Sequence, residues 1–162
     1  MAGYLAKFGA GATVEQVFRD VGANIRGTLD ATASLVPSDI EYRALVSVAR
    51  PSLQRRFASA FRSTGASAIA FPTTPAPAVP ITQGPTIAVG GAEVPFDPYF
   101  GHNVLPGSTA GLPGLVLPAG LTRGGLPVGI EFDGPARSDR ALLALGLSLE
   151  RALGAIPAPK IS

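Results

Sequence analysis

Residues 125–153 read GLPVGIEFDGPARSDRALLALGLSLERAL, and this stretch contains the two patterns that decide the fold. Its first part, residues 127–132, is a short run of mainly apolar residues and predicts a buried strand. Ser138 and Asp139 then provide an N-cap and a first-turn acid, and residues 141–153 are apolar nearly all round, which predicts a largely buried helix. A buried strand followed by such a helix is typical of an α/β architecture with a sheet covered by helices.

Other short apolar runs precede this stretch. Residues 66–71 and 114–117 predict two more buried strands, and residues 86–89 and 93–96 flank Gly90-Gly91, which predicts a small hairpin. Three sheet strands and a hairpin are fewer than a typical sheet contains. We therefore expect an incomplete sheet with an open edge, and a chain that is marginally stable or self-associating when isolated.

The first third of the sequence predicts two helices. Thr13 and Gln16 form a capping-box pattern ahead of a helix over 13–22, and Ser38 and Glu41 repeat it ahead of a long helix over 38–63. Pro51 lies inside the second helix and predicts a kink or a restart at residues 50–52. The apolar stripe of this helix, which we expect to face the core, is formed by Leu45, Ala49, Leu53, Phe57 and Phe61.

Length and charge exclude several classes of protein. At 162 residues and 46% hydrophobic, the chain suits one core, so we expect a single domain over 1–162 with a terminal tail at 157–162. The net charge of +2 gives no strong field. Four arginines cluster between residues 50 and 62 at spacings typical of a solvated helix face, so the sequence argues against a nucleic-acid partner: Arg50, Arg55, Arg56 and Arg62.

The chain contains no cysteine and a single histidine, His102. This composition excludes disulfides and thiolate or histidine metal sites, and we expect no metal and no cofactor. No apolar run approaches the roughly 18 residues of a membrane span, and the N-terminus has no signal-peptide pattern, so we expect a cytoplasmic protein without a membrane partner.

No complete set of catalytic residues can be assembled from the residues alone. His102 and Ser108 could form a hydrolase pair, but no nucleophile elbow presents the serine, and a histidine at a loop or helix end is the better interpretation. Residues 107–111, GSTAG, are better explained by close packing of small residues. Glu131 and Asp133 alternate on one face of a strand end, but Asp133 precedes Gly134-Pro135 and is better explained as part of a turn.

Four separated motifs nevertheless occur in an order and spacing that resemble the C-terminal part of the amidase signature family. They are AFPTTPAP at 70–77, PGSTAGLPGLVLPAG at 106–120 after Asn103, GLPVGIEFDGP at 125–135 and SDRALLALG at 138–146. The resemblance extends from about Tyr4 to Pro157 and is strongest to the branch of indoleacetamide and mandelamide hydrolases. It implies that the chain holds one portion of the family's mixed sheet, with Gly129, Ile130 and Phe132 in a central strand.

The family hydrolyses carboxamides with a Ser, cis-Ser, Lys triad that lies in a Gly/Ser-rich signature upstream of the resembling region. This sequence has no such stretch, and neither Lys7 nor Lys160 has the surroundings of the family's catalytic lysine. No catalytic residue can therefore be assigned, and the chain is expected to be inactive alone.

The resemblance does suggest residues that approach the substrate channel. The candidates for substrate contacts are Thr73, Thr74, Phe100, Asn103 and Ser108. Each has a structural alternative, because Pro, Thr, Asn and Ser are also the usual residues of turns and caps.

The sequence leaves three functional hypotheses. The first is the C-terminal segment of an amidase that acts on a small carboxamide such as an aryl acetamide, with the N-terminal amidase segment as a possible partner. The second is a stand-alone binding module or vestigial relative without catalysis. The third, and least supported, is an unrelated hydrolase that uses His102 with Ser108.

Overall fold

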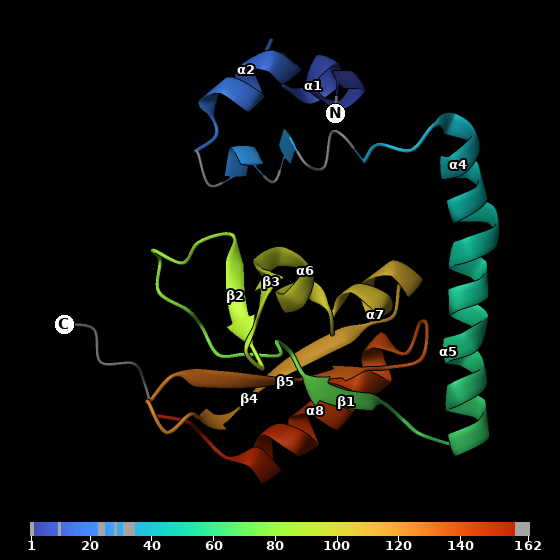
Figure 1. Ribbon diagram of the computed structural model, residues 1–162. Coiled ribbons are helices and arrows are strands. Elements are labelled where there is room, and N and C mark those ends of the chain that lie inside the picture. Colours follow the sequence, from blue (N-terminus) through green and yellow to red (C-terminus); the bar gives the residue numbers. More distant parts are fainter. Residues whose placement is uncertain (1, 10, 23–24, 28, 31–34, 158–162) are drawn as a thin grey trace. The chain divides into compact units, whose positions relative to one another are not determined.

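The computed structural model describes residues 2–9, 11–22, 25–27, 29–30 and 35–157 (Figure 1). The chain divides into two compact units, Met1–Ala44 and Leu45–Ser162, and we describe each by itself. Most of the predicted tail at 157–162, including Lys160, lies outside the described residues. No described helix is both long and apolar enough to cross a membrane.

The first unit contains the helices α1 (Ala2–Phe8), α2 (Val14–Asp20) and α4 (Asp39–Ala44). The predicted capping box of α2 is confirmed, because the Gln16 amide donates to Thr13 Oγ1 at 3.2 Å and the Thr13 amide donates to Gln16 Oε1 at 2.7 Å. Lys7 lies in α1 with its ammonium 5.0 Å from the Phe8 ring centroid.

The capping box that precedes α4 is confirmed in the same way. The Ser38 amide donates to Glu41 Oε2 at 2.8 Å, and the Glu41 amide donates to Ser38 Oγ at 3.3 Å. The Ser38 hydroxyl also donates to Glu41 Oε2 at 2.7 Å, and the hydrogen bonds that the hydroxyl and the amide of Ser38 donate hold the pKa of the Glu41 carboxyl below its usual value. The starts of α2 and α4 are therefore set by local sequence.

The second unit contains the remaining elements. In chain order they are the π-helical turn η1 (Leu45–Ala49), α5 (Arg50–Thr64), β1 (Ile69–Pro72), β2 (Thr86–Val89), β3 (Ala92–Pro95), α6 (Phe96–Gly101), α7 (Leu105–Ala110), β4 (Gly114–Leu121), β5 (Pro127–Asp133) and α8 (Asp139–Leu153). The restart predicted near Pro51 is confirmed, since η1 ends at Ala49 and α5 begins at Arg50 with the proline in its first turn.

The strands form two small antiparallel sheets. The larger has the order β1-β5-β4, and β2 pairs with β3 in the predicted hairpin, where Gly90 and Gly91 both have positive φ. The expected α/β class with a small, open sheet is confirmed, and every pairing among the described strands is antiparallel. In β4 the register shifts between Pro118 and Gly120.

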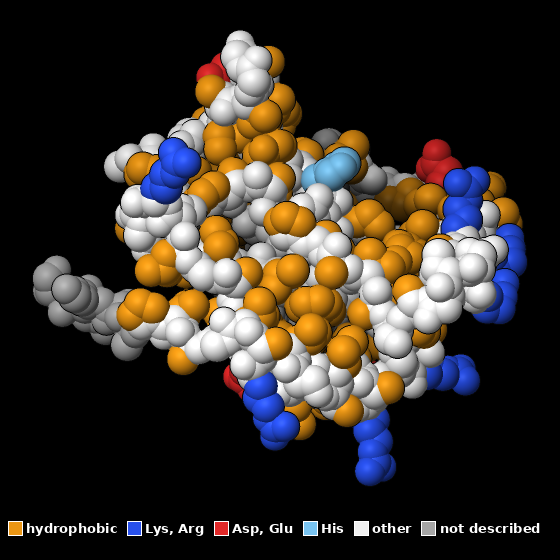
Figure 2. All heavy atoms as spheres, turned by 90° about the horizontal axis from the view of Figure 1, so that it is seen from below, with side chains coloured by type: hydrophobic (Ala, Val, Ile, Leu, Met, Phe, Trp, Pro, Cys, Tyr) orange, Lys and Arg blue, Asp and Glu red, His pale blue; other side chains and the backbone are white. Residues whose placement is uncertain are grey.

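The hydrophobic core lies between the larger sheet and α8. Leu117, Phe132 and Leu142 are buried together, and Leu115 and Ile130 pack against them. The prediction that α8 is largely buried was wrong, because its buried residues are only Leu142 and Gly146, whereas the side chains of Leu143 and Leu147 are 61% and 59% exposed. Figure 2 shows apolar side chains gathered on one face of the molecule.

Two other expectations need correction. Ser138 precedes α8, but its side chain caps no amide, and Ser138 Oγ is buried without a hydrogen-bond partner among the described residues. The stripe expected to face the core along the long helix is buried only at Phe61, and Leu45 is 52% exposed. The local sequence set these elements but not how much of each is covered.

Candidate functional site

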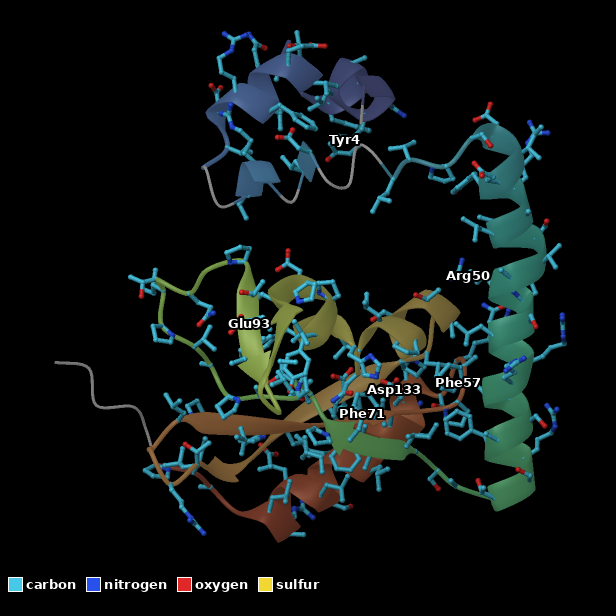
Figure 3. All side chains as sticks on the ribbon, viewed as in Figure 1. Tyr4, Arg50, Phe57, Phe71, Glu93 and Asp133 are labelled. Carbon is cyan, nitrogen blue, oxygen red and sulfur yellow. The ribbon has the colours of Figure 1, made fainter. Side chains whose placement is uncertain are left out.

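The candidate site comprises two carboxyl groups on the face of the larger sheet opposite α8 and a cavity beside the loop that follows β1. Side chains alternate along β5, so Ile130 and Phe132 point toward α8 while Glu131 and Asp133 point to the other face. Glu131 lies between Phe71 of β1 and Val116 of β4 in the sheet register. Figure 3 shows Asp133 and Phe71 on the side of the sheet where α6 and α7 lie.

Asp133 is the buried acid of this face, with 5% of its surface exposed. Burial raises the pKa of the Asp133 carboxyl above its ordinary value. Burial, together with the nearby Asp133 charge, raises the pKa of the Glu131 carboxyl. The two carboxyls therefore form a pair in which both pKa values lie above their ordinary values.

Two glycines make room for this pair. A Cβ on Gly107 of α7 would overlap Oδ2 of Asp133, and a Cβ on Gly114 would lie 3.0 Å from Asp133 Oδ1 and 3.1 Å from Glu131 Oε1. The prediction that residues 107–111 serve close packing is confirmed, because Gly107 and Ala110 are buried and Gly111 ends α7 with φ 75°.

The loop that follows β1 is fixed at several points. Asn103 Nδ2 donates to the Pro72 carbonyl at 2.8 Å, and the Thr73 amide donates to the Gly129 carbonyl at 3.1 Å. Thr74 Oγ1 donates to the Ala76 carbonyl at 2.8 Å. Thr73 Oγ1 is buried and has no hydrogen-bond partner among the described residues.

A cavity of about 380 Å³ lies between this loop and the first half of β5. Its wall is mainly apolar and contains Pro72, Thr74, Pro77, Val128 and Ile130. A concave, mostly apolar cavity with a few polar groups near it is the usual form of a small-molecule site.

Three of the five predicted contact residues lie together at this loop: Thr73, Thr74 and Asn103. Phe100 lies on α6, where its ring stacks on Phe96 at 4.4 Å and meets Tyr99 edge-on at 5.8 Å. Ser108 is an exposed residue of α7 whose amide donates to the Val104 carbonyl at 3.1 Å. In the described structure, no hydrogen bond joins Phe100 or Ser108 to the loop.

His102 lies at the end of α6, as the preferred interpretation of the sequence expected. Its side chain is exposed and its amide donates to the Tyr99 carbonyl at 3.3 Å. Within the described part of the chain, no hydrogen bond joins His102 to Ser108. The geometry gives no support to a pair formed by these two residues.

Sequence reasoning missed the burial of Asp133. The Asp-Gly-Pro pattern was interpreted as a turn, but Asp133 is the last residue of β5 and is buried, while the Gly134 amide donates to the Pro113 carbonyl at 2.9 Å. The alternation with Glu131 was a signal that could have found it. No sequence pattern indicated that Gly107, which leaves space for the carboxyl, lies beside Asp133.

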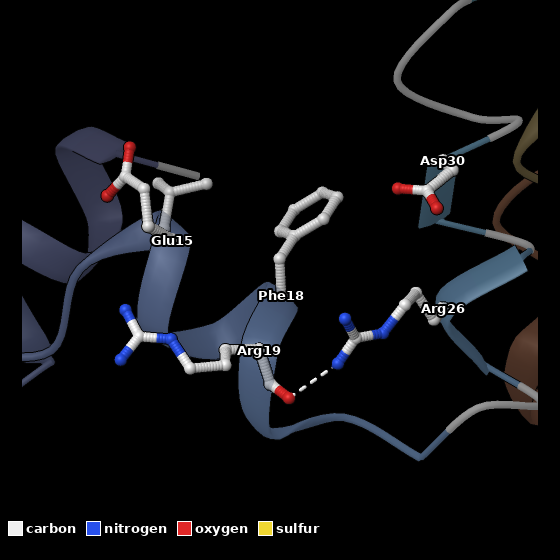
Figure 4. Close-up of a pocket in the computed structure, with 6 residues that line it drawn as sticks. Glu15, Phe18, Arg19, Arg26 and Asp30 are labelled. Atoms are coloured by element: carbon white, nitrogen blue, oxygen red, sulfur yellow. Dashed lines mark hydrogen bonds between the residues drawn. The ribbon is translucent and has the colours of Figure 1, made fainter.

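Other features offer less chemistry. An open cavity in the first unit is lined by side chains of mixed charge, and Arg26 donates to the Arg19 carbonyl at the end of α2 at 2.6 Å (Figure 4). The described residues contain no group of three or more acidic or histidine side chains that could hold a metal ion.

Comparisons with known proteins show which proteins this chain is similar to. The amidase family model matches residues 15–143. Indoleacetamide hydrolase of Agrobacterium vitis is 45% identical over 116 residues, which cover 72% of this chain and 25% of that protein. Mandelamide hydrolase of Pseudomonas putida is 38% identical over 119 residues, which cover 73% of this chain and 22% of that protein.

A solved structure described as a crystal structure of amidase superimposes with a TM-score of 0.75 at 28% identity. The match covers 94% of this chain and 32% of that one. This chain therefore spans about a quarter to a third of the length of the proteins that it resembles.

Proposed function

The chain belongs to the amidase family, and from that premise we propose that it forms part of the substrate pocket of an enzyme that hydrolyses a small linear carboxamide to a carboxylic acid and ammonia. The observation that carries the proposal is the loop at Pro72–Thr74, which Asn103 holds beside a mainly apolar cavity. Matches to indoleacetamide and mandelamide hydrolases support the same reaction.

We infer an aromatic acetamide as the substrate class. The named substrates of these two relatives both combine an aromatic ring with a primary amide. Proline, valine and isoleucine are among the residues that make the wall of the cavity mainly apolar, which suits a ring, and about 380 Å³ is within the usual size of a small-molecule site. The hydroxyls of Thr73 and Thr74 and the Asn103 amide supply the polar groups near this wall.

Amide hydrolysis also needs a nucleophile, a base and donors for the developing oxyanion. In this proposal these groups come from residues outside this chain, as the resemblance to the Ser, cis-Ser, Lys family implies. The chain then shapes and positions one side of the pocket. It has no turnover when it is alone.

A chimera tests this function directly. The segment of Agrobacterium vitis indoleacetamide hydrolase that aligns with this chain is replaced by residues of this chain, and ammonia release from indole-3-acetamide is measured. We expect the chimera to retain turnover and the isolated chain to show none. A folded chimera without activity, or an isolated chain with enzyme-like turnover, would contradict the proposal.

Substitutions in the chimera test the loop. Asn103→Ala frees the Pro72 carbonyl, so we expect KM for indole-3-acetamide to rise about tenfold or more, because a misplaced pocket wall weakens binding. Arg56→Ala, on the exposed surface of α5, is the matched control and should leave KM unchanged. Equal KM values for the two variants would show that Asn103 does not position the wall of the pocket.

The alternative is a stand-alone binding module, which the buried, unpartnered Thr73 hydroxyl of the loop favours. Calorimetric titration of the isolated chain with indole-3-acetamide separates the two ideas. Saturable binding without turnover, lost in Thr73→Val, would support the module. Undetectable binding by the isolated chain, together with an active chimera, would support the amidase segment.

A further inference from the structure

A second hollow of the larger unit lies away from the loop, along one side of α5. It has a volume of about 870 Å³, and its walls come from α5, from the C-terminal end of α7 and from the loop at residues 135–137. We call it the arginine groove. The residues of α5 that line it recur at helical spacing, so one continuous stripe of the helix forms the wall.

The position of α5 beside the groove is fixed by contacts to α7. Arg50 Nε donates to the Thr109 carbonyl at 2.9 Å, and Gln54 Nε2 donates to the Ala110 carbonyl at 2.9 Å. Figure 3 shows Arg50 on α5. These bonds occupy carbonyls at the end of α7, which is a favourable place for a cation.

Three other arginines near this hollow make no hydrogen bond of this kind within the described residues. Arg55, Arg62 and Arg137 line the groove and are exposed, and within the described residues none of them makes a hydrogen bond or an ion pair. No aspartate or glutamate lines the groove. Three guanidinium groups therefore border one hollow without a carboxylate to offset them.

Arg137 is held in an uncommon conformation. Its φ of 67° makes it the only non-glycine residue with positive φ among the described residues. Such a conformation is unfavourable for a residue with a Cβ and persists only where the surroundings enforce it. Here it occurs in the loop that forms the wall of the groove opposite α5.

The floor of the groove is apolar. Phe61 and Ala110 are buried at 7% and 1% exposure, and Ala58 and Leu112 lie beside them. A floor that accepts apolar side chains and a rim that accepts carboxylates together fit an amphipathic acidic ligand. Arginine is the residue best suited to pair with carboxylates, because its planar fork binds both oxygens.

The spacing of the rim sets the form of the ligand. Arg55 and Arg62 are seven residues apart on α5, which places their Cα atoms about 10 Å apart along the helix axis. In an extended segment of the polyproline II type, which has three residues per turn, residues three positions apart lie on the same side and about 9 Å apart. We propose that the arginine groove binds an extended acidic segment of a partner protein, with carboxylates three residues apart on Arg55 and Arg62 and apolar side chains on the floor.

Peptide binding tests this proposal. The probe is a fluorescein-labelled hexapeptide with two glutamates three residues apart and apolar residues between them, titrated with the full chain by fluorescence anisotropy. The matched peptide carries two glutamines instead. We expect the glutamate peptide to bind at least about tenfold more tightly, because hydrogen bonds to charged groups are the stronger ones, and to weaken as salt rises.

Charge reversal on α5 locates the site. Arg62→Glu and Arg55→Glu should each weaken the glutamate peptide at least about tenfold. Arg56→Glu changes the net charge by the same amount on the same helix but outside the groove, so it should change affinity less than about twofold. Circular dichroism of all three variants checks that the fold is kept.

Several results would overturn the proposal. Equal binding of the two peptides would show that charge is not recognised, and equal losses in Arg56→Glu and Arg62→Glu would show a nonspecific effect. Tighter binding of a single-stranded oligonucleotide, lost in Arg62→Glu, would assign the groove to nucleic acid. Self-association that Arg55→Glu abolishes, measured by sedimentation, would assign it to a second copy of the chain.

Discussion

On one face of the β1-β5-β4 sheet, Phe132 and Leu117 pack with Leu142 of α8, whereas on the other face Asp133 lies against Gly107 of α7 and Glu131 lies beside Gly114. Glu131, Phe132 and Asp133 are consecutive residues of β5, so neighbouring positions of one strand contribute to both faces. The first face excludes water and stabilises the fold. The second face keeps two carboxyls in a setting that favours their protonated forms, which costs stability at neutral pH.

Along the second half of β5, even-numbered and odd-numbered residues face opposite sides of the sheet and therefore lie in different environments. A side chain on β5 is apolar and part of the core on the first face, or carries a carboxyl on the second face. The glycines beside the second face leave the space that these carboxyls occupy. Substitutions on and beside the two faces test this contrast, and those with the larger expected effects come first.

Adjacent residues of β5 should respond in opposite ways. Phe132→Ala removes a buried ring and should lower the free energy of unfolding by about 3–5 kcal/mol, whereas Glu131→Gln should change it by less than about 1 kcal/mol. Urea unfolding followed by circular dichroism measures both. If Phe132→Ala is unfolded in buffer, Phe132→Leu provides a milder variant. Similar losses at both positions would contradict the assignment of the two faces.

Glycines on the two faces should also differ. Alanine improves helix propensity by about 1 kcal/mol at either site, so the clash decides the sign. At Gly107 the clash is with the buried Asp133 carboxyl, and we expect a net loss of about 1–3 kcal/mol. At Gly146 it is with the end of the Leu115 side chain, which can rotate, and we expect little net change.

A double-mutant cycle checks the cause of the Gly107 effect. Asp133→Ala removes the group with which the new Cβ collides, so it should recover most of the loss in Gly107→Ala. Thermal unfolding of the four proteins in the cycle gives the interaction energy. Additive losses would show that Gly107 is needed for another reason.

The loop beside the second face should show a smaller effect. Asn103→Ala removes the hydrogen bond to the Pro72 carbonyl and should lower the free energy of unfolding by about 0.5–1.5 kcal/mol. Thr73→Val is the matched control, because it replaces an unpartnered buried hydroxyl by a methyl group and should be neutral or stabilising. Loss of stability in Thr73→Val would reveal a partner for that hydroxyl.

The smallest effect concerns pH. Because the pKa values of Asp133 and Glu131 are raised in the folded state, the folded chain binds more protons than the unfolded chain above their ordinary values of 3.8 and 4.5. Their contribution to stability is therefore present at low pH and is lost as pH rises through the raised values.

Asp133→Asn should reduce this loss. Comparing the free energies of unfolding of the variant and the natural chain at several values from pH 4 to pH 7 isolates the contribution of Asp133 from that of the other acids. We expect the difference to favour the variant increasingly as pH rises. A difference that does not change with pH would mean that the carboxyl is hydrated in the folded chain.

Much of the local structure could be predicted from short sequence patterns. Thr13 and Ser38 mark two helix starts by capping boxes, and Gly90-Gly91 marks the hairpin. Pro51 marks the start of α5. Each of these features depends on groups within about four residues of one another, which is why the sequence alone is sufficient.

The short helices α6 and α7 could not be predicted in the same way. The sequence of α7, LPGSTA, contains a proline and a glycine, and its helix propensity is low. The helix forms because Pro106 lies in its first turn and because Gly107 and Ala110 are small enough to be buried. Nothing in the local sequence reports that Asp133, far along the chain, needs this space.

The sequence alone was sufficient for the strands, the principal helices, the capping boxes of α2 and α4 and the resemblance to the amidase family, because these follow from local backbone preferences and recurring motifs. Only the tertiary structure decided that Asp133 is buried under Gly107, that Asn103 holds the loop after β1, and that three arginines border one groove. The reason is physical: burial, raised pKa values and unpaired charge arise where segments distant in sequence meet, and no local preference encodes that meeting.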